Sequence, residues 1–467
     1  MKTTILKNAS LYINGNTQVG SLIIKHGKIS KILLHNKSSN EEYSCRSKRN
    51  SIEIDCNGRL VIPGLIDIHS HLRDMEQSEK ETFLTGTKAA AYSGITTVFT
   101  MPNTIPPANN VNQIKLWLKK AKSNSYIDVG FIAGFPNNFD DFKIKKMINK
   151  SIIGFKIYPH KPLNRIDWTN KEIINQLFDV SSKYNIPIFI HPEWPLTEDE
   201  KKYLQNEINS KKVNLLELYD KVKSGDKELR YVKFIIDNYI EYVKENHRES
   251  QRYPIIHFCH ISTKKSYEYI RSIQLADKSF KISMEITPHH LLLSNNINLE
   301  NPNIGKVDPP LRDQEDQSFL YNQFKKGDLN IIASDHAPHT LNEKSNGFFD
   351  APSGFPEFET YSLILLDKVL NNEIELKYLV QACSENPALN FHLKDKGFIK
   401  EGYQADLIII ETVDPYKINP DNFKSKAKFS PYKDFWITTS LWKVLFRGME
   451  VNKEKITPKG KIIKIEF

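Results

Sequence analysis

The sequence contains little cysteine. Four cysteines, Cys45, Cys56, Cys259 and Cys383, are scattered over 467 residues, and no two of them form a Cys-x-x-Cys pair. This spacing indicates neither a disulfide framework nor a thiolate zinc site. Any metal ion must therefore be held by histidine, aspartate, glutamate or a modified side chain.

A long apolar run is also missing. No stretch of about 18 apolar residues occurs, and the opening residues MKTTILKNASLYINGN are too polar for a secretory signal. We therefore expect a soluble, cytoplasmic protein that has no membrane partner. The net charge of +9 comes from lysines dispersed among Asp, Glu and Asn. No basic stripe interleaved with aromatic residues indicates nucleic-acid binding.

One pattern repeats between residues 60 and 340. A short apolar or β-branched run ends in a polar residue and is followed by a longer amphipathic segment. The runs lie at 60–69, 95–101, 128–134, 152–158, 186–191, 254–260, 280–287 and 330–335. Eight parallel strands that alternate with helices close into a barrel. The sequence therefore predicts an α/β protein with a TIM-like (β/α)8 barrel over residues 60–390.

The two ends of the chain differ from this pattern. Residues 1–59 and 391–467 read as short strands, and we expect them to form one small β-sandwich domain, with the polar segment 35–51 as a loop. The charged, mostly helical segment 194–250 separates the fifth and sixth runs. It could cover the side of the barrel or contact a second subunit, and the sequence leaves both open.

Chemically reactive side chains stand at the C-terminal ends of the predicted strands, where barrel enzymes carry their active sites. Histidine accounts for only 14 of the 467 residues, so four histidines at such positions are unexpected by chance. The side chains that share these positions are His69, His71, Lys156, His191, His260 and Asp335.

The stretch GLIDIHSHLRD, residues 64–74, places His69 and His71 two residues apart. On an extended strand both imidazoles point to one face and can bind one cation through nitrogen. The preceding run has apolar residues on both faces, as in a buried parallel strand, and this disfavours two solvated histidines. If the chain stays extended, Arg73 would point at the same cavity; the alternative is an arginine on the surface.

Lys156 lies in the apolar stretch GFKIYP. Burial lowers the pKa of a lysine, and a neutral amine beside a cationic cluster can react with carbon dioxide to form a carbamate. A lysine that extends to the barrel mouth is an equal alternative. Asp335, in IIASDHAPH, could bind a metal ion and accept a proton, or could cap the following helix.

Two other histidines are expected to lie outside the site. His257 is three residues from His260, so we expect it on the opposite face of its strand, packed against a helix. His160 follows the fourth run in a turn, where we expect solvent exposure. Whether residues 340–356 form a mobile lid is left open.

The motifs, in this order and spacing, resemble the amidohydrolase superfamily and, within it, the dihydroorotase branch. They include GLIDIHSHLRD, MPNT, GFKIY, HFCHISTKKS, EITPHHLLL, KVDPPLR, ASDHAPH and ENPALNFHLKDKGFIKEGYQADLIIIE. Each motif is weak alone, but together they extend over almost the whole chain.

The resemblance implies a binuclear zinc enzyme with two Zn2+ per subunit, bridged by carboxylated Lys156. His69, His71 and Asp335 would bind one ion. The other would be held by His191 and His260. The resemblance further implies reversible cyclisation of N-carbamoyl-L-aspartate to dihydroorotate in pyrimidine (UMP) biosynthesis, with Asp335 as the acid/base.

The resemblance also implies a substrate-binding set, Arg73, Asn103 and His339. Two departures bear on it. The chain reads RDMEQ where the branch commonly reads REPG, and Asp308 stands where many relatives have asparagine; a carboxylate cannot donate a hydrogen bond unless it is protonated. The alternatives are another cyclic amidase, of the hydantoinase or allantoinase type, or a non-catalytic dihydroorotase-like partner protein. A homo-oligomer is expected by analogy only.

Overall fold

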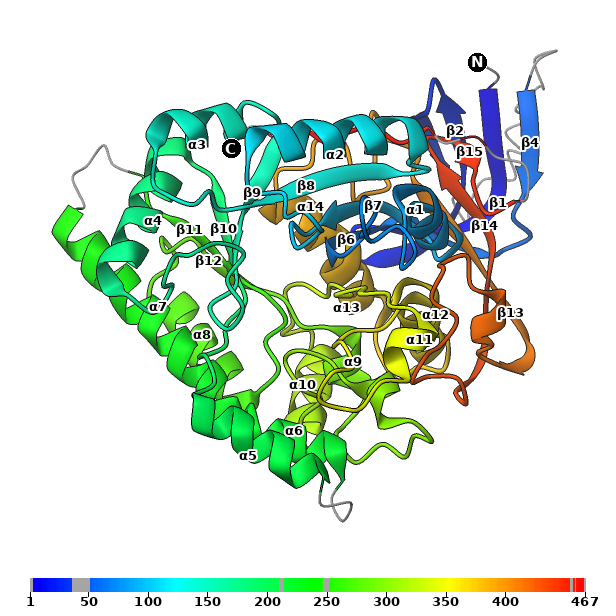
Figure 1. Ribbon diagram of the computed structural model, residues 1–467. Coiled ribbons are helices and arrows are strands. Elements are labelled where there is room, and N and C mark those ends of the chain that lie inside the picture. The colour runs from blue at the N-terminus through cyan, green and yellow to red at the C-terminus, as the bar shows by residue number, and fades with distance from the viewer. Residues whose placement is uncertain are drawn as a thin grey trace.

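The structure is a computed structural model that describes residues 3–35, 51–209, 214–246, 252–453, 457 and 459–465. Within these ranges the chain forms a parallel barrel sheet surrounded by helices and a second sheet built from both ends of the chain (Figure 1). The loop expected at 35–51 lies almost entirely outside the described residues.

Seven parallel strands in the described ranges form the barrel sheet, and each pairs with its neighbour in chain order. Their side chains are almost all buried, as a parallel sheet covered by helices requires. The strands are β6 (Leu65–Ser70), β7 (Ile95–Thr100), β8 (Asp128–Gly134), β9 (Ile152–Ile157), β10 (Pro187–Ile190), β11 (Ile255–Phe258) and β12 (Ile282–Met284).

The eighth predicted run, 330–335, closes the barrel as an irregular segment. Ile332 forms a parallel bridge with Ile286 on one side, and His336 forms one with Ser70 on the other. The backbone of Asp335 has a φ of 51°, which interrupts the extended conformation that a strand needs. The TIM-like barrel is therefore confirmed, although its last position is not a regular strand.

Gly64 divides the run that we expected as one strand from 60 to 69. β5 (Leu60–Pro63) pairs with β1 (Thr3–Ile13) in the second sheet, whereas β6 belongs to the barrel. A Cβ at position 64 would lie 2.5 Å from the side chain of Thr96. Glycine is therefore required where the chain passes from one sheet to the other.

Strands from both chain ends make the second sheet, in which β13 (Leu407–Lys417) pairs with β5. Its apolar core includes Leu6, Leu22, Leu407 and Leu445. The other strands are β2 (Asn16–Lys25), β3 (Lys28–Leu34), β4 (Ser51–Asp55), β14 (Trp436–Phe446) and β15 (Met449–Glu450). Figure 1 shows the blue N-terminal and red C-terminal strands side by side. The domain boundaries 59/60 and 390/391 stay a prediction.

Helices between the barrel strands cover its outside, and several begin at an Asn, Asp or Thr whose side chain accepts from the first turn. The main ones are α1 (Phe83–Tyr92), α2 (Val111–Asn124), α3 (Asp141–Ile148), α4 (Lys171–Tyr184), α8 (Lys264–Ala276), α10 (Gln314–Lys326) and α12 (Phe358–Leu370). Shorter helices are α9 (Pro288–Leu292), α11 (Leu341–Lys344), α13 (Leu376–Val380) and α14 (Asn386–Asn390).

The segment expected as a helical excursion contains α5 (Glu198–Asn209), α6 (Leu215–Val222) and α7 (Gly225–Asn246). α7 packs between α4 and α8, so it covers the side of the barrel, one of the two roles that the sequence left open. Figure 1 shows all three helices along one edge of the molecule. Among the described residues, no helix is long and apolar enough to span a bilayer.

Candidate metal centre

The side chains expected as metal ligands converge at the C-terminal ends of the barrel strands. The ring centroids of His69 and His71 are 5.5 Å apart, and those of His69 and His260 are 5.3 Å apart. His191 lies 4.4 Å from His260 by the same measure. Lys156, on β9, is close enough for its positive charge to oppose the protonation of His69, His191 and His260.

The first group contains His69, His71 and Asp335, whose ligand atoms lie within 4.8 Å of one another. Oδ1 of Asp335 is 2.8 Å from Nε2 of His71 and 3.3 Å from Nε2 of His69. Burial alone would raise the pKa of the Asp335 carboxyl, but the two imidazoles hold it well below its usual range. Asp335 is therefore ionised at neutral pH, as a metal ligand must be.

The protonation of His71 is decided by its neighbours. Burial lowers the pKa of His71 to about 4, so the imidazole is neutral at pH 7. Nδ1 lies 2.6 Å from Oδ1 of Asn103, and Nε2 lies 2.8 Å from Oδ1 of Asp335. A neutral ring has one N–H, so one of its two nitrogens presents a lone pair to an oxygen, which a bound cation would stabilise.

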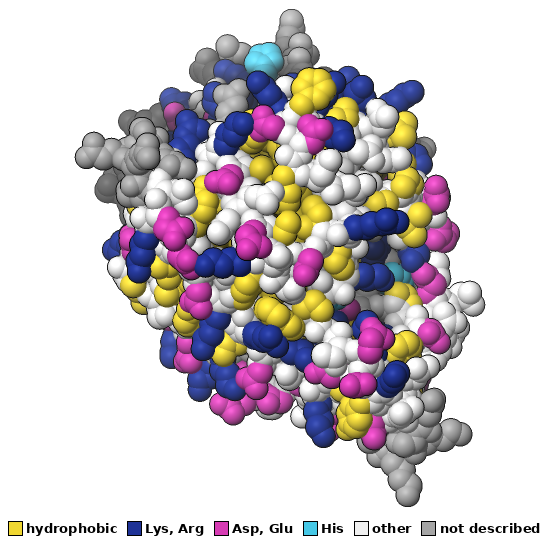
Figure 2. Space-filling view, turned by 60° about the vertical axis from the view of Figure 1, so that its left-hand side comes forward, with side chains coloured by type: hydrophobic (Ala, Val, Ile, Leu, Met, Phe, Trp, Pro, Cys, Tyr) yellow, Lys and Arg dark blue, Asp and Glu magenta, His cyan; other side chains and the backbone are white. Residues whose placement is uncertain are grey.

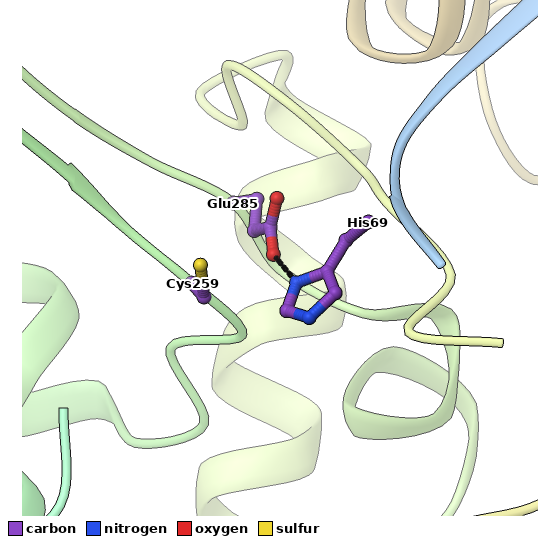
Figure 3. Close-up of side chains that lie close together, drawn as sticks. All are labelled: His69, Cys259 and Glu285. Carbon is purple, nitrogen blue, oxygen red and sulfur yellow. Dashed lines mark hydrogen bonds and ion pairs between the residues drawn. The ribbon is translucent and has the colours of Figure 1, made fainter. Parts of the chain in front are cut away.

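His69 is held by a carboxylate that sequence reasoning missed. Nδ1 of His69 contacts Oε1 of Glu285, in the EITPHH motif, as the dashed line in Figure 3 marks. The ring therefore directs Nε2 at Asp335. Burial alone would lower the pKa of His69, but Glu285 and Asp335 raise it to about 10, so this position favours a positive charge.

His257 corrects our expectation. Its Nε2 lies 3.0 Å from Oε2 of Glu285, and its ring contacts Phe189 and Phe391 instead of packing on the face of a helix. His257 thus supports the carboxylate that orients His69. Carboxylate support of this kind is usual behind metal-binding histidines. Cys259 lies beside His69 and Glu285 and is buried (Figure 3).

The second group contains Lys156, His191 and His260. Nζ of Lys156 and Nδ1 of His260 are buried without a hydrogen-bond partner among the described residues. Burial holds the pKa of His191 and His260 well below the usual range, and so both rings are neutral. A buried polar atom without a partner is costly, so these atoms fit a site completed by a metal ion and a modified lysine.

His160 is half-buried, which corrects the expectation of solvent exposure. Its ring stacks on His191 with the centroids 4.0 Å apart. Glu193, two residues after His191, places Oε2 3.0 Å from Nε2 of that ring. The HPE spacing was the only sequence signal for Glu193, and it does not reveal which side chain the glutamate contacts.

The residues expected to bind substrate lie beside the first group. Arg73 is buried, and its Nη2 is 3.1 Å from Nε2 of His339. Burial lowers the pKa of Arg73 to about 10, which leaves it charged at neutral pH. The pKa of His339 falls to about 3 through burial and the nearby guanidinium. Asn103 contacts His71, as described above.

A space-filling view shows a hollow on one face of the molecule (Figure 2). A histidine side chain is visible inside the hollow, and Lys or Arg side chains lie at its edge.

The amidohydrolase family model matches residues 60–436, more than half of the chain. The chain belongs to the amidohydrolase family. Members of this family generally depend on metal ions, and the described residues of this amidohydrolase hold candidate ligand groups.

Relatives of this amidohydrolase carry a consistent name. Dihydroorotase of Pyrococcus abyssi is 32% identical over 466 residues, which cover 98% of this chain and 98% of that protein. Dihydroorotase of Methanosphaera stadtmanae is 32% identical over 439 residues, 93% of this chain and 92% of that protein. The predicted membership of the dihydroorotase branch is confirmed.

Solved structures confirm the fold of the amidohydrolase. L-Hydantoinase (dihydropyrimidinase) from Arthrobacter aurescens superposes with a TM-score of 0.83 at 23% identity, covering 100% of this chain and 98% of that one. A dihydropyrimidinase from Brevibacillus agri gives the same TM-score at 21% identity, over 99% and 98% of the two chains.

Proposed function

We propose that this amidohydrolase is a dihydroorotase. It catalyses the reversible cyclisation of N-carbamoyl-L-aspartate to (S)-dihydroorotate, a step of pyrimidine (UMP) synthesis. The observation that carries this proposal is the alignment with dihydroorotases over nearly the whole chain. A buried arginine beside the candidate ligands supports it, because the substrate carries a carboxylate.

The metal ions in this proposal are two zinc ions. His69, His71 and Asp335 would hold one, His191 and His260 would hold the other, and carboxylated Lys156 would serve as the shared, bridging ligand. The carbamate forms when the neutral Nζ amine bonds to the carbon of carbon dioxide and releases a proton. When bound, zinc supplies a Lewis acid that polarises the ring carbonyl and acidifies water.

Asp335 is the acid/base of the proposed reaction. Because its carboxylate is ionised and lies against two imidazoles, it can accept a proton from the attacking water. The same oxygen then delivers the proton to the ring nitrogen as the amide bond breaks. Cyclisation uses the reverse transfer, since both directions share one transition state.

Arg73 is the group that selects the substrate in this proposal. A guanidinium binds a carboxylate through two parallel hydrogen bonds, and dihydroorotate carries a carboxylate that hydantoin lacks. His339 is a further substrate contact in this proposal, because its Nε2 lies beside the Arg73 guanidinium. Asn103 follows β7, the strand beside β6. In the proposed complex it contacts the substrate carboxylate.

The test compares dihydroorotate, hydantoin and allantoin as substrates of the purified protein, with zinc counted in the same preparation. Turnover of dihydroorotate alone, with about two zinc ions per chain, is the expected result. Preferred turnover of hydantoin or allantoin would replace the proposal with another cyclic amidase. Full zinc content without turnover of any of the three would favour a non-catalytic partner protein. The homo-oligomer and the cytoplasmic location stay predictions.

A further inference from the structure

The two histidines of the second group, His191 and His260, are each followed by residues that contact the helical segment between β10 and β11. Glu193 lies two residues after His191, and Ser262 and Thr263 follow His260 at the start of α8. The helices that these residues contact are α6 and α7. The proposed reaction does not yet use either helix.

Lys223, at the end of α6, holds the side chain behind His191. Its Nζ lies 2.9 Å from Oε1 of Glu193, and Oε2 of Glu193 lies 3.0 Å from Nε2 of His191. The two side chains of this ion pair are 6% and 3% exposed. Removal of one partner from a buried ion pair is costly, so the pair keeps the Glu193 carboxylate against the ring.

The same loop is joined to α7 through the backbone. The N–H of Trp194, the residue after Glu193, donates to the carbonyl oxygen of Lys227 at 3.3 Å. Lys223 also lies 2.5 Å from Oδ1 of Asp308, and the two carboxylates hold its pKa well above the ordinary value although burial opposes the charge. Contacts from both helices therefore fix the residues that follow His191.

Glu228, in the first turn of α7, holds the residues that follow His260. Its Oε2 accepts from the backbone N–H of Ser262 at 3.1 Å and from the Ser262 hydroxyl. Its Oε1 accepts from the backbone N–H of Thr263 at 3.2 Å and from the Thr263 hydroxyl at 2.8 Å. Glu228 is 1% exposed. A buried carboxylate that accepts four hydrogen bonds gives this backbone one fixed position.

His260 needs such support because its backbone is strained. A φ of 37° lies in the left-handed region, which is unfavourable for a residue with a Cβ and persists only where the surroundings impose it. The start of α7 lies close to this backbone, since a Cβ at Gly225 would be 2.6 Å from Cγ2 of Thr263. α7 therefore packs directly on the residues that follow the strained position.

Arg312 connects the two supports. Its Nη1 donates to the carbonyl oxygen of Lys223 at 2.7 Å, and its Nε donates to Oγ of Ser262 at 2.9 Å. Nη2 lies 3.7 Å from Oε2 of Glu228. The Arg312 side chain is 4% exposed. One buried guanidinium thus contacts the end of α6, the start of α7 and the loop before α8.

We propose that the end of α6 and the start of α7 position both ligands of the second metal ion. Lys223 acts on His191 through Glu193, and Glu228 acts on His260 through the backbone of the next residues. Both are positioning residues, because each acts through another group. This inference rests on the proposed function, since it requires a second metal ion held by these two histidines. It gives the helical segment a role besides covering the barrel.

The test measures zinc affinity at the second position alone. His71→Ala removes a ligand of the first ion, so the ion that remains is the one held by His191 and His260, and its affinity is measured by competition with a chelator. Added to this background, Glu228→Gln should lower the affinity by about 10- to 100-fold, as loss of an outer partner of a metal ligand predicts. Lys223→Met should have an effect of similar size.

The reciprocal background separates positioning from a general loss of folding. In His191→Ala the remaining ion is held at the first position, where Glu228→Gln should change the affinity by less than about threefold, because Glu228 supports no ligand of that ion. Circular dichroism checks that each variant folds. The matched controls are Glu245→Gln in α7 and Lys221→Met in α6, both at exposed positions, and neither should change the affinity at either position.

The outcomes separate this inference from the proposed function. Two zinc ions per wild-type chain, with unchanged affinity in Glu228→Gln and Lys223→Met, overturn the positioning role and leave the function standing. An equal loss of affinity at both positions also overturns it, because it shows a general effect on the fold. A wild-type chain that neither binds two zinc ions nor turns over dihydroorotate overturns both.

Discussion

Nε2 of His71 lies 2.8 Å from Oδ1 of Asp335, and this one oxygen also faces Nε2 of His69 at 3.3 Å. The carboxylate oxygen thus lies against the Nε2 atoms of two imidazoles. In this arrangement Asp335 can contact a metal ion and still exchange a proton with a group in the pocket.

Replacement of Asp335 by asparagine should remove the acid/base while it preserves the shape of the side chain. An amide cannot accept and return the proton, so we expect kcat for dihydroorotate to fall by about 100- to 10 000-fold. Steady-state kinetics and circular dichroism check this. Asp434→Asn, at an exposed aspartate, should keep normal activity. Near-normal turnover by Asp335→Asn would remove this residue from the proton transfer.

Arg73→Met should chiefly damage binding of the carboxylate. The guanidinium is buried beside His339 and keeps its charge, so its loss should raise KM for dihydroorotate by about 10- to 150-fold. Turnover of dihydrouracil, which has the same ring without the carboxylate, should change little. Arg165→Met, at an exposed arginine, is the control. If KM for dihydroorotate is unchanged, another residue holds the carboxylate.

Lys156→Ala should lower the metal content. Nζ of Lys156 is buried without a hydrogen-bond partner among the described residues, in the middle of the candidate ligands. Removal of the proposed carbamate should leave at least one of two zinc positions unfilled, as counted by atomic absorption on the purified protein. Lys161→Ala, at an exposed lysine nearby, should retain the full count. Two zinc ions in Lys156→Ala would contradict a bridging role for this residue.

The convergence of the candidate ligand side chains could be predicted from the sequence, because the barrel pattern determines where side chains at strand ends meet. His69, Lys156 and His191 come directly from this rule, since each lies on or just after a buried strand. The rule uses only the local sequence and the symmetry of the fold. It therefore places these side chains near one another without knowledge of any particular contact.

The support around the ligands could not be predicted in this way. Glu285 contacts His69 across 216 residues of sequence, and Lys223 contacts Asp308 across 85, so neither pairing has a local signal. We expected His257 to lie away from the site because a strand that alternates as far as His260 would place the two side chains on opposite faces. β11 ends at Phe258 and His260 has a φ of 37°, so the alternation stops before that residue.

Glu285→Gln should weaken metal binding without removing a ligand. Glu285 positions His69 and is itself bonded to His257. Loss of its charge should reduce zinc affinity by about 10- to 100-fold, measured by competition with a chelator, while kcat at saturating zinc stays closer to normal. Glu268→Gln, on the exposed face of α8, should match the wild type. Unchanged zinc affinity would limit Glu285 to a packing role.

Lys344 and Lys306 hold the loop that the sequence left open as a lid. Nζ of Lys344 donates to the carbonyl oxygens of Asn303 and Pro352, each at 2.8 Å. Lys306 donates to the carbonyl of Ala351 at 2.6 Å. Two buried amines thus bind backbone carbonyls on both sides of this loop. Their protonation therefore affects the free energy of unfolding.

The stability of this loop region should depend on pH through Lys344. Burial lowers the pKa of Lys344 to about 7, whereas the unfolded chain keeps a lysine near 10.5. Between these values the unfolded state binds the additional proton, so the free energy of unfolding should rise with pH by up to about 1.4 kcal/mol per unit. Below pH 7 this contribution is constant.

Lys344→Met removes the titrating group, so its free energy of unfolding should fall progressively behind that of the wild type as pH rises from 7 to 9. Urea unfolding at pH 6, 7, 8 and 9 measures the difference, with the exposed Lys326→Met as the control. A constant difference across this range would show that Lys344 stays charged in the folded protein.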